Sequence, residues 1–361
     1  MKVLHIIPDL DYGNAARQLS WLAPVVKQSA VDCRVCVLSG HGPLANSLAN
    51  VTVDYLHWNR WVDLKPFWRL HEVLTTFQPD VIHCWRHESV RALALVRYPN
   101  KSPVIVSLGA WPSITSGIGT MSDRWLLRRV NRVVVQWPEQ MEQWRLWGLP
   151  PEKLIQIAPG VGSFPHLNPS QSSAIDSHLP ANARVILCVG PLEASKGIKD
   201  AVWVFHILGF LFPDLYLVLV GEGPEQERLG RLAAGLFPER MISLGSLPDY
   251  GEILARAEVV WVPSLKPRGF NVALEAMAAG KPVVASRLPG LTEIIEDAET
   301  GFLVQPGDKV NMAKKTRLIL DDANRRRQMG EAGRRRAPER FSVDSLAQAY
   351  SRLYQSLIQG A

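Results

Sequence analysis

Lys196 and Glu275 are the two side chains whose type and position best suit chemistry on a phosphorylated ligand. Lys196 lies in the segment GPLEASKG, a glycine-bounded turn that follows an apolar run typical of a buried strand. Its ammonium group can reach a diphosphate as a point charge. Glu275 begins the run EAMAAG, where a carboxylate suits the N-terminal end of a helix and can accept two hydrogen bonds from hydroxyl groups. The alternatives are a surface lysine in a turn and an acid that only marks a helix start.

Backbone amides offer a second kind of contact with oxygen atoms. The N–H groups of Gly269, Phe270, Asn271 and Val272 lead into the helix that carries Glu275, so they can cradle phosphate or sugar oxygens. Gly13 precedes another helical pattern and could do the same in the first half of the chain. A plain turn is the alternative for that glycine.

No cluster of residues has the spacing of a metal site. His83 and His87 are four residues apart, but they flank the end of a predicted strand and have no carboxylate beside them in helical register. Cys33 and Cys36 lie in an alternating apolar run, where positions three apart face opposite sides of a strand. We therefore expect no bound metal, buried cysteines and no disulfide framework.

The elements that must position these residues follow one pattern twice. Residues 2–7 predict a buried strand, followed by a turn that ends at Gly13 and by a helical stretch. Residues 184–190 predict a second such strand, again followed by a turn and a helical stretch. Short apolar runs then alternate with helical patterns in both halves. This alternation predicts parallel sheets covered by helices on both faces.

The chain is thus expected to be α/β, with two Rossmann-like, doubly wound domains. We place them at 1–163 and 184–340, joined by a linker at 164–183 that is rich in Pro, Ser and Asn. The amphipathic helix in residues 341–361 is expected to pack back on the first domain. Ligands of such sheets bind beyond the carboxyl ends of the strands, so we expect the domains to face each other across one cleft.

Length and composition agree with this organisation. The chain has 361 residues, enough for two domains, and 47% hydrophobic with 20% charged residues is ordinary for a globular protein. The longest uncharged apolar stretch, 201–213, is too short to cross a bilayer. The N-terminus lacks a secretory signal, so we expect a cytoplasmic protein.

Positive charge and tryptophan are concentrated in the first half. Residues 1–165 hold 17 Lys and Arg against 12 Asp and Glu, and ten of the 12 Trp. No basic run is interleaved with a nucleic-acid module, so no nucleic acid partner is expected. Segment 123–132, DRWLLRRVNR, suits an anionic or lipid-linked acceptor and a peripheral site on the inner face of a membrane, unless it is an ordinary amphipathic helix. Loop tryptophans could stack on sugar rings, namely Trp58, Trp61, Trp68, Trp85 and Trp111.

Four segments of the second half resemble the C-terminal domain of the GT-B, family 4 retaining glycosyltransferases. They are GPLEASKG at 190–197, VGEGPE at 220–225, ISLGSLPD at 242–249, and the stretch from PSLKPRGF to FLVQPGD at 263–308. The first half resembles the family more weakly, through the Gly13 turn and the runs DVIHCW and PVIVSL.

This resemblance implies a GT-B fold and a hexosyltransferase-type enzyme. Such an enzyme moves a sugar from a nucleotide-diphosphate donor to a glycan or lipid-linked acceptor, with retention of anomeric configuration and no cofactor or metal. Lys196 would hold the diphosphate and Glu275 the ribose. The donor-binding positions implied in this sequence are Gly13, Gly190, Lys196, Gly197, Gly223, Leu247, Gly269, Phe270, Asn271, Val272 and Glu275.

Three positions depart from the family pattern. Pro191 stands where an arginine usually helps to hold the diphosphate. The first of two paired glutamates is missing, because its position falls on Pro267 or, with a one-residue deletion, on Arg268. Gly109 follows the run PVIVSL where the family has a histidine.

Two interpretations follow. In one, the chain is a divergent transferase in which Arg268 replaces the positive charge lost at Pro191 and acts beside Lys196 and Glu275 in catalysis. In the other, the GT-B protein has lost catalysis and binds a nucleotide, a sugar or a partner. The retention of Lys196, Glu275 and the flanking glycines favours the enzyme. Binding of one nucleotide-sugar that is lost in Lys196→Ala would distinguish a working donor site from a degenerate scaffold.

Overall fold

The computed structural model divides the chain into two compact units. The first comprises Met1–Gly160 and Phe341–Ala361, and the second comprises Val161–Arg340. The structure describes residues 1–28, 31–48, 50–58, 64–97, 102–109, 118–162, 179–180, 182–247, 249–267 and 270–360. Most of the linker expected at 164–183 lies outside these residues.

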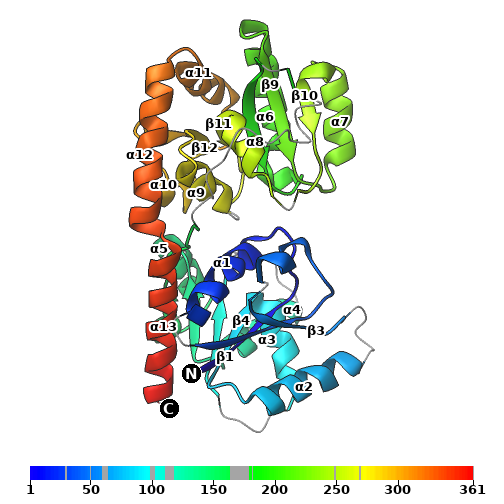
Figure 1. Ribbon diagram of the computed structural model, residues 1–361, viewed down its shortest axis with the longest axis vertical. Helices are drawn as coiled ribbons and strands as arrows, with labels where there is room; N and C mark the ends of the chain where they lie inside the picture. The colour runs from blue at the N-terminus through cyan, green and yellow to red at the C-terminus, as the bar shows by residue number, and fades with distance from the viewer. Residues whose placement is uncertain are drawn as a thin grey trace. The chain divides into compact units, whose positions relative to one another are not determined.

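The first unit alternates strands and helices, as drawn in Figure 1. Its elements are β1 (Lys2–Ile7), α1 (Asn14–Gln28), β2 (Asp32–Val37), η1 (Pro43–Leu48), β3 (Thr52–Tyr55), α2 (Lys65–Phe77), β4 (Val81–Trp85), α3 (Arg86–Ala94), β5 (Val104–Ser107), α4 (Ile118–Leu127), β6 (Arg132–Val135), α5 (Pro138–Leu146), η2 (Pro151–Lys153), β7 (Leu154–Gln156) and α13 (Val343–Gln359).

The sheet of this unit is parallel, with the strand order β3-β2-β1-β4-β5-β6-β7. The order reverses between β1 and β4, which is the topological switch point of a Rossmann-like sheet. Strand alternation sends Val3 and Ile7 to one face of the sheet and Leu4 and Ile6 to the other. Both faces are buried, as parallel sheets require.

The second unit repeats the pattern. Its elements are β8 (Arg184–Val189), η3 (Ala194–Lys196), α6 (Ile198–Leu211), β9 (Leu215–Val220), α7 (Gln226–Ala234), η4 (Pro238–Arg240), β10 (Met241–Ser243), α8 (Gly251–Arg256), β11 (Ala257–Val262), α9 (Asn271–Ala278), β12 (Val283–Ser286), α10 (Leu291–Ile294), β13 (Gly301–Val304), α11 (Lys309–Leu320) and α12 (Ala323–Phe341). The parallel sheet has the order β10-β9-β8-β11-β12-β13, with its switch point between β8 and β11. The predicted α/β class with two Rossmann-like domains is confirmed.

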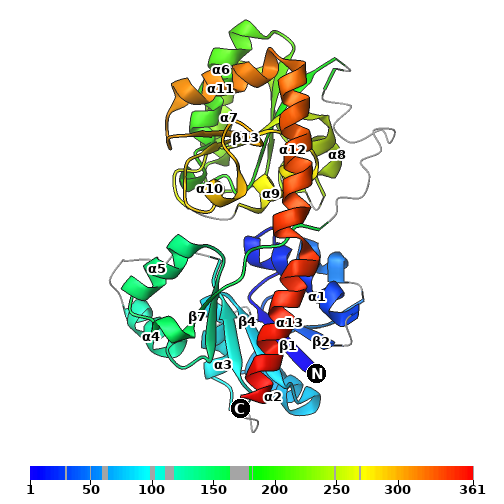
Figure 2. The same cartoon turned by 90° about the vertical axis from the view of Figure 1, so that its left-hand side faces the viewer.

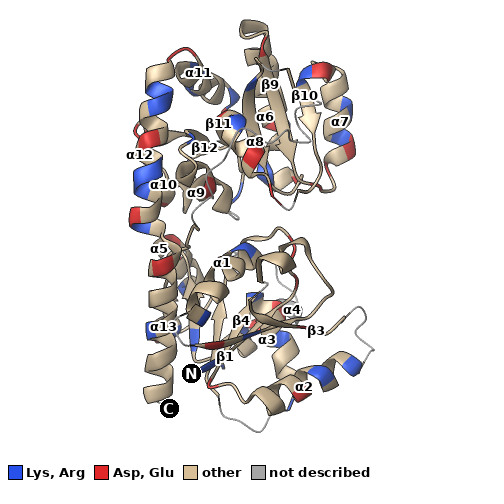
Figure 3. Ribbon diagram, viewed as in Figure 1, with Lys and Arg blue, Asp and Glu red and all other residues tan. Residues whose placement is uncertain are grey.

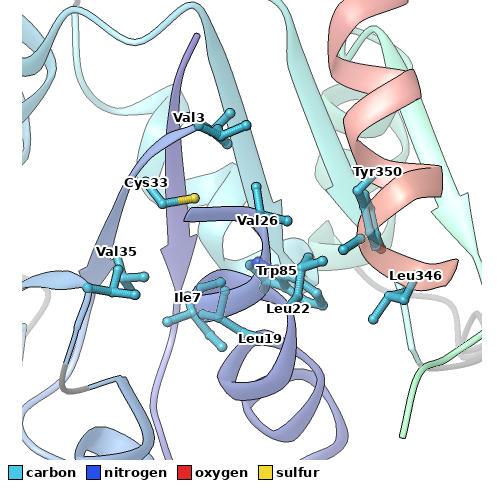
Figure 4. Packing of buried hydrophobic residues seen from close by; sticks show 14 of the residues in the cluster. Val3, Ile7, Leu19, Leu22, Val26, Cys33, Val35, Trp85, Leu346 and Tyr350 are labelled. Atoms are coloured by element: carbon cyan, nitrogen blue, oxygen red, sulfur yellow. The ribbon is translucent and has the colours of Figure 1, made fainter. Parts of the chain in front are cut away.

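Helix α13 belongs to the core of the first unit although it closes the chain. The Ser342 hydroxyl accepts a hydrogen bond from the Ser345 backbone N–H and caps its first turn. Figure 2 shows the helix along the first unit, and Figure 4 shows Leu346 and Tyr350 beside α1 and Trp85. One face of α13 is buried, through Leu346, Ala347, Tyr350, Leu353, Tyr354 and Leu357. The last helix is therefore a structural part of the domain formed by the first 160 residues.

Helices α12 and α13 differ in their content of charged residues. Figure 3 shows many blue and red residues along α12 and few along α13. The run Arg325–Arg336 on α12 is only partly solvated. Arg326 pairs with Glu258 at 3.3 Å, and Arg336 pairs with Glu296 at 2.6 Å. These pairs hold α12 against other elements of its own unit.

The cysteine prediction is confirmed. All four cysteines are buried and free, and Cys33 and Cys36 lie on opposite faces of the first sheet. Within the described ranges, no helix combines the length and the apolar character that a bilayer span needs.

Segment 123–132, for which an ordinary amphipathic helix was the alternative interpretation, does not form one continuous helix. Helix α4 ends at Leu127, and Arg132 already opens β6. Residues 128–131 form a turn between the two elements, and the valines after Arg132 suit a strand because β-branched residues favour a pleated surface.

Candidate active site

Glycine turns follow three neighbouring strands of the second unit and run side by side. The Gly190 N–H donates to the Val220 carbonyl at 2.9 Å, and the Gly221 N–H donates to the Gly245 carbonyl at 2.7 Å. Gly221 has φ +137°, and a Cβ there would lie 2.1 Å from the Gly190 carbonyl oxygen. An ideal Cβ at Gly190 would meet no atom within 4 Å. The carboxyl edge of this sheet thus has open space directly after β8.

Lys196 lies in a turn that is fixed by a second close approach. It ends the 3-10 turn η3, and its side chain is half-buried. Gly197 has φ +66°, and a Cβ there would lie 2.0 Å from the Pro263 carbonyl oxygen. The Leu265 N–H also donates to the Ser195 carbonyl at 2.8 Å. The loop after β8 is therefore locked to the loop after β11, which positions Lys196 at the carboxyl edge.

Helix α9 follows β11 and carries Glu275, whose side chain is 1% exposed. The helix begins at Asn271, so Glu275 lies in its second turn rather than at its start. The expectation that Glu275 begins the helix is wrong, because Asn271 and Val272 already adopt helical geometry. The backbone N–H groups of Asn271 and Val272 lie in the first turn. The residue before them, Phe270, makes no side-chain capping hydrogen bond to this turn. Arg268 and Gly269 lie outside the described residues.

The remaining predicted donor positions of the second unit lie on the next two loops. Gly223 follows β9, and a Cβ there would lie 2.6 Å from the Leu192 carbonyl oxygen. Leu247 is half-buried after β10. The Glu222 carboxylate accepts from the Ser246 N–H at 3.2 Å and so connects these loops. Sheet topology brings Gly190, Lys196, Gly223, Leu247 and the start of α9 to one edge of the second sheet.

In the first unit, Gly13 and Gly109 lie at the corresponding edge. Gly13 directly precedes α1, and its Cβ position is open. A Cβ at Gly109 would lie 2.8 Å from Nδ2 of Asn14. The Asn14 amide also donates to Oε1 of Gln136 at 3.2 Å. The Asn14 amide therefore occupies the space beside residue 109.

A small pocket opens at this edge. Its lining residues are uncharged and comprise Asn14, Ala15, Gln18, Trp85, Ser107, Leu108, Gly109, Val134, Gln136, Ile157, Ala158, Pro159, Leu346 and Tyr350. Gln18 supports its wall, because its amide donates to the Gly160 carbonyl and accepts from the Gly160 N–H, both at 2.8 Å. The pocket combines amide, hydroxyl and aromatic groups from the first unit.

His83 lies under this pocket and is 0% exposed. Its Nδ1 is 2.7 Å from the Tyr354 hydroxyl and its Nε2 is 2.7 Å from the Ser107 hydroxyl. Burial, and then the neighbouring His5, lower the pKa of His83 well below its ordinary value. His87 lies apart on α3, where its Nδ1 is 3.3 Å from Oε2 of Glu88. In the described part of the chain, no three His, Cys, Asp or Glu residues are grouped to hold a metal ion.

The aromatic residues expected to bind an acceptor are scattered. Trp85 lines the pocket, whereas Trp58 packs on Phe67 at 4.4 Å between ring centroids. Trp68 is 73% exposed on α2. Trp61 and Trp111 lie outside the described residues.

Comparison with known proteins accounts for both units. The family model for "Glycosyltransferase Family 4" matches residues 22–162, and the model for "Glycosyl transferases group 1" matches residues 171–336. The chain belongs to the glycosyltransferases. As a group 1 glycosyltransferase it is an enzyme, and the family predicted from its sequence motifs is confirmed.

Individual relatives and a solved structure agree with this assignment. The lipopolysaccharide core biosynthesis glycosyltransferase LpsD of Rhizobium meliloti (strain 1021) is 28% identical over 360 residues, which is 98% of each chain. The MMP alpha-(1->4)-mannosyltransferase of Mycolicibacterium hassiacum is 42% identical over 170 residues, 46% of this chain and 41% of that protein. The crystal structure of Anabaena Alr3699/HepE in complex with UDP-glucose has a TM-score of 0.83 at 21% identity and covers 99% of this chain and 100% of that one. The fold of this glycosyltransferase is GT-B.

The sequence did not identify the pocket of the first unit. Ser107, Asn14 and Gln136 had no motif to mark them, and Tyr350 was included only within the amphipathic helix expected in residues 341–361. The signal that could have found them is a buried histidine on a strand, since a buried imidazole needs hydrogen-bonding partners.

Proposed function

We propose that this glycosyltransferase moves a sugar from a nucleotide-diphosphate donor to a glycan or lipid-linked acceptor, with retention of anomeric configuration. The observation that carries the proposal is the carboxyl edge of the second sheet. There, open space beside Gly190, the half-buried Lys196 and the first turn of α9 lie on loops that are locked together. UDP-glucose in complex with Alr3699/HepE, a protein of the same fold, supports this choice of donor.

Each part of the donor has a partner in this proposal. The ammonium of Lys196 pairs with the diphosphate, and the amides of Asn271 and Val272 receive its oxygens at the positive end of the helix dipole. The Glu275 carboxylate accepts from the ribose hydroxyls. Arg268 supplies the second positive charge in place of the arginine that Pro191 replaces.

The chemical step follows from this charge arrangement. The bond between the anomeric carbon and the diphosphate oxygen breaks, and the electron pair leaves with the diphosphate, whose charge Lys196 and Arg268 stabilise. The acceptor hydroxyl attacks the same face of the oxocarbenium-like centre, and its proton passes to the departing phosphate oxygen. Positive side chains and helix dipoles take the role that a metal has elsewhere, so turnover is expected to survive a chelator.

Calorimetry with UDP-, GDP- and ADP-sugars tests the donor site. We expect one donor to bind, and Lys196→Ala and Glu275→Ala each to weaken that binding at least about tenfold, the loss of a charge-assisted hydrogen bond. Lys199→Ala and Glu227→Ala are matched controls, because both side chains are exposed on helices of the same unit. Binding of none of these donors would overturn the proposal. Tight binding without turnover would favour the degenerate binding protein.

Turnover tests Arg268 separately. If Arg268 compensates for Pro191, Arg268→Ala lowers both donor affinity and kcat, whereas Arg268→Lys retains part of each. Unchanged kinetics in Arg268→Ala would contradict its catalytic role.

We also propose that the enzyme binds its acceptor at an anionic membrane surface. On α4, Met121 is 77% exposed and Trp125 is 54% exposed, and the Arg129 guanidinium lies 3.5 Å from the centroid of the Trp125 ring. Arg124 and Arg128 are exposed beside them. Exposed apolar and aromatic groups among arginines suit the interface of anionic lipids.

Cosedimentation with vesicles tests this surface. Binding to phosphatidylglycerol vesicles should exceed binding to phosphatidylcholine vesicles and fall as salt rises. Trp125→Ala combined with Arg129→Ala should weaken it, whereas Arg231→Ala, an exposed arginine on α7, should not. Binding that is independent of salt and of Trp125 would argue against the proposal.

A further inference from the structure

Four side chains beneath the pocket of the first unit form a continuous hydrogen-bonded chain. The Tyr354 hydroxyl is 2.7 Å from Nδ1 of His83, and Nε2 of His83 is 2.7 Å from the Ser107 hydroxyl. The Ser107 hydroxyl is in turn 2.7 Å from the hydroxyl of Tyr350. His83 and Tyr354 are 0% exposed, whereas Ser107 and Tyr350 line the pocket. This series of hydrogen bonds therefore connects the protein interior with the pocket wall.

The direction of these hydrogen bonds follows from burial. Among the described residues, Nδ1 of His83 is the hydrogen-bonding partner of the Tyr354 hydroxyl, and no second partner is within reach. A buried hydroxyl hydrogen without an acceptor is costly, so Tyr354 donates and Nδ1 accepts. His83 is neutral, because burial holds its pKa well below the ordinary value. Its single proton is then on Nε2, and Nε2–H donates to the Ser107 oxygen.

The number of hydroxyl hydrogens on Ser107 and Tyr350 determines how many hydrogen-bond donors face the pocket. Ser107 and Tyr350 share one hydrogen bond but have two hydroxyl hydrogens between them. The Ser107 oxygen already accepts from His83, so one of the two hydrogens points elsewhere. Because both residues line the pocket, that hydrogen is available to a group inside it.

The rest of the pocket is also uncharged. The Trp85 indole N–H donates to Nδ1 of His5 at 3.2 Å, so the indole presents its apolar ring to the pocket rather than its polar edge. Burial lowers the pKa of His5 to about 3, which keeps this partner neutral. Oε1 of Gln136 accepts from the Asn14 amide at 3.2 Å, so two uncharged amide groups also line the pocket. The pocket thus offers hydrogen-bond donors and aromatic surface without charge.

We propose that this pocket binds one uncharged oxygen of a sugar, a hydroxyl or hydroxymethyl group, which accepts a hydrogen bond from the Ser107 and Tyr350 pair. His83 is a positioning residue, since it acts through Ser107 and sets which hydrogen is left for the ligand. The small size of the pocket matches a single functional group, and aromatic faces pack well on the C–H face of a sugar ring. The inference rests on the proposed glycosyltransferase function and leaves two sources for the sugar, the donor and the acceptor.

Nitrogen-15 NMR of labelled histidine tests the hydrogen-bond direction without any ligand. His83 should be the Nε2–H tautomer at pH 7, because burial lowers its pKa well below the ordinary value. Tyr354→Phe removes the donor to Nδ1, so a mixture of tautomers should then be observed, while Tyr216→Phe on β9 should leave the His83 signals unchanged. An Nδ1–H tautomer in the unmodified protein would overturn the proposal.

Binding tests use UDP-glucose and its monodeoxy analogues for the donor, and methyl glucoside, galactoside and mannoside with their deoxy analogues for the acceptor. Ser107→Ala and Tyr350→Phe each leave one hydroxyl hydrogen for the pocket, so each should change affinity less than about threefold. The double variant removes both and should weaken binding about tenfold, the effect of one neutral hydrogen bond. In that variant, one deoxy analogue should bind as well as its parent sugar.

Whether this analogue is a UDP-glucose derivative or a methyl glycoside shows which sugar occupies the pocket, that of the donor or that of the acceptor. A response only among the UDP-glucose analogues assigns the pocket to the transferred sugar, and a response only among the methyl glycosides assigns it to the acceptor. If no sugar shifts the Trp85 indole signal, or if the double variant binds every sugar normally, the pocket holds only water and the proposal fails. Calorimetric binding of the nucleotide donor at Lys196 would still stand in that case, which separates this failure from failure of the proposed function.

Discussion

Leu353→Ala should destabilise the first unit strongly, although Leu353 lies 193 residues beyond Gly160, where the main segment of that unit ends. The Leu353 side chain is 4% exposed and belongs to the core formed with α1 and β1. A buried Leu→Ala substitution costs about 2–5 kcal/mol, because apolar contact is lost and a cavity remains. Since a domain is stable by only about 5–15 kcal/mol, this variant should lose a large share of that stability.

The magnitude can be measured by urea unfolding followed by tryptophan fluorescence. Ten of the 12 Trp lie in residues 1–165, so the signal reports mainly on the first unit. The midpoint should fall with little change in the m-value, and the melting temperature should fall by roughly 5–15 °C. Ile358→Ala is the matched control on the same helix, because Ile358 is 39% exposed, and it should cost less than about 1 kcal/mol. Equal costs for the two variants would refute the assignment of α13 to this core.

Three further predictions use other features. Gly197→Ala should weaken both stability and donor binding, because φ +66° and the neighbouring carbonyl oxygen leave no room for a Cβ, whereas Gly230→Ala, with open space in α7, should be harmless. Thermal unfolding and calorimetry compare them, and equal effects would contradict the close approach. The four buried thiols should react with a disulfide reagent only after unfolding, since burial raises the pKa of Cys33 to about 12; fast labelling of the native protein would contradict this. The free energy of unfolding should be level above pH 7 and fall below about pH 6, because His5 and His83 stay neutral when folded but bind protons when unfolded. The slope should be about 1 kcal/mol per pH unit for each imidazole, and a flat urea series from pH 8 to pH 4 would contradict it.

The elements around Lys196 could be predicted from the sequence because their determinants are local. A strand, a glycine turn and a helix start lie within about 15 residues of one another around Lys196, and strand periodicity fixes the rest of the sheet. Helix ends were less predictable. Glu275 was placed one turn too early, because the first helical residues Asn271 and Val272 carry no strong capping signal. The short strand β7 (Leu154–Gln156) was also not predicted, since a three-residue edge strand has too little periodicity to detect.

The pocket of the first unit could not be predicted, because its contacts join distant parts of the chain. His83 and Tyr354 are 271 residues apart, and Asn14 and Gln136 are 122 residues apart. Each residue alone fits an ordinary role, as a strand histidine or as part of an apolar helix stripe. Only the fold brings them together, and no spacing in the sequence encodes that the last helix covers the first sheet.

The two units differ in how they can discriminate between ligands. In the function proposed above, Lys196 and the first-turn amides of α9 bind the negatively charged diphosphate at the edge of the second sheet, so donor affinity should weaken as salt rises. The pocket of the first unit has no charged lining residue and rests on neutral histidines, so it can select only by the direction of its hydrogen bonds and by shape. Directional selection between neutral groups is insensitive to salt. A ligand that binds through this pocket should therefore keep its affinity between low and high ionic strength, whereas the nucleotide part of the donor should not.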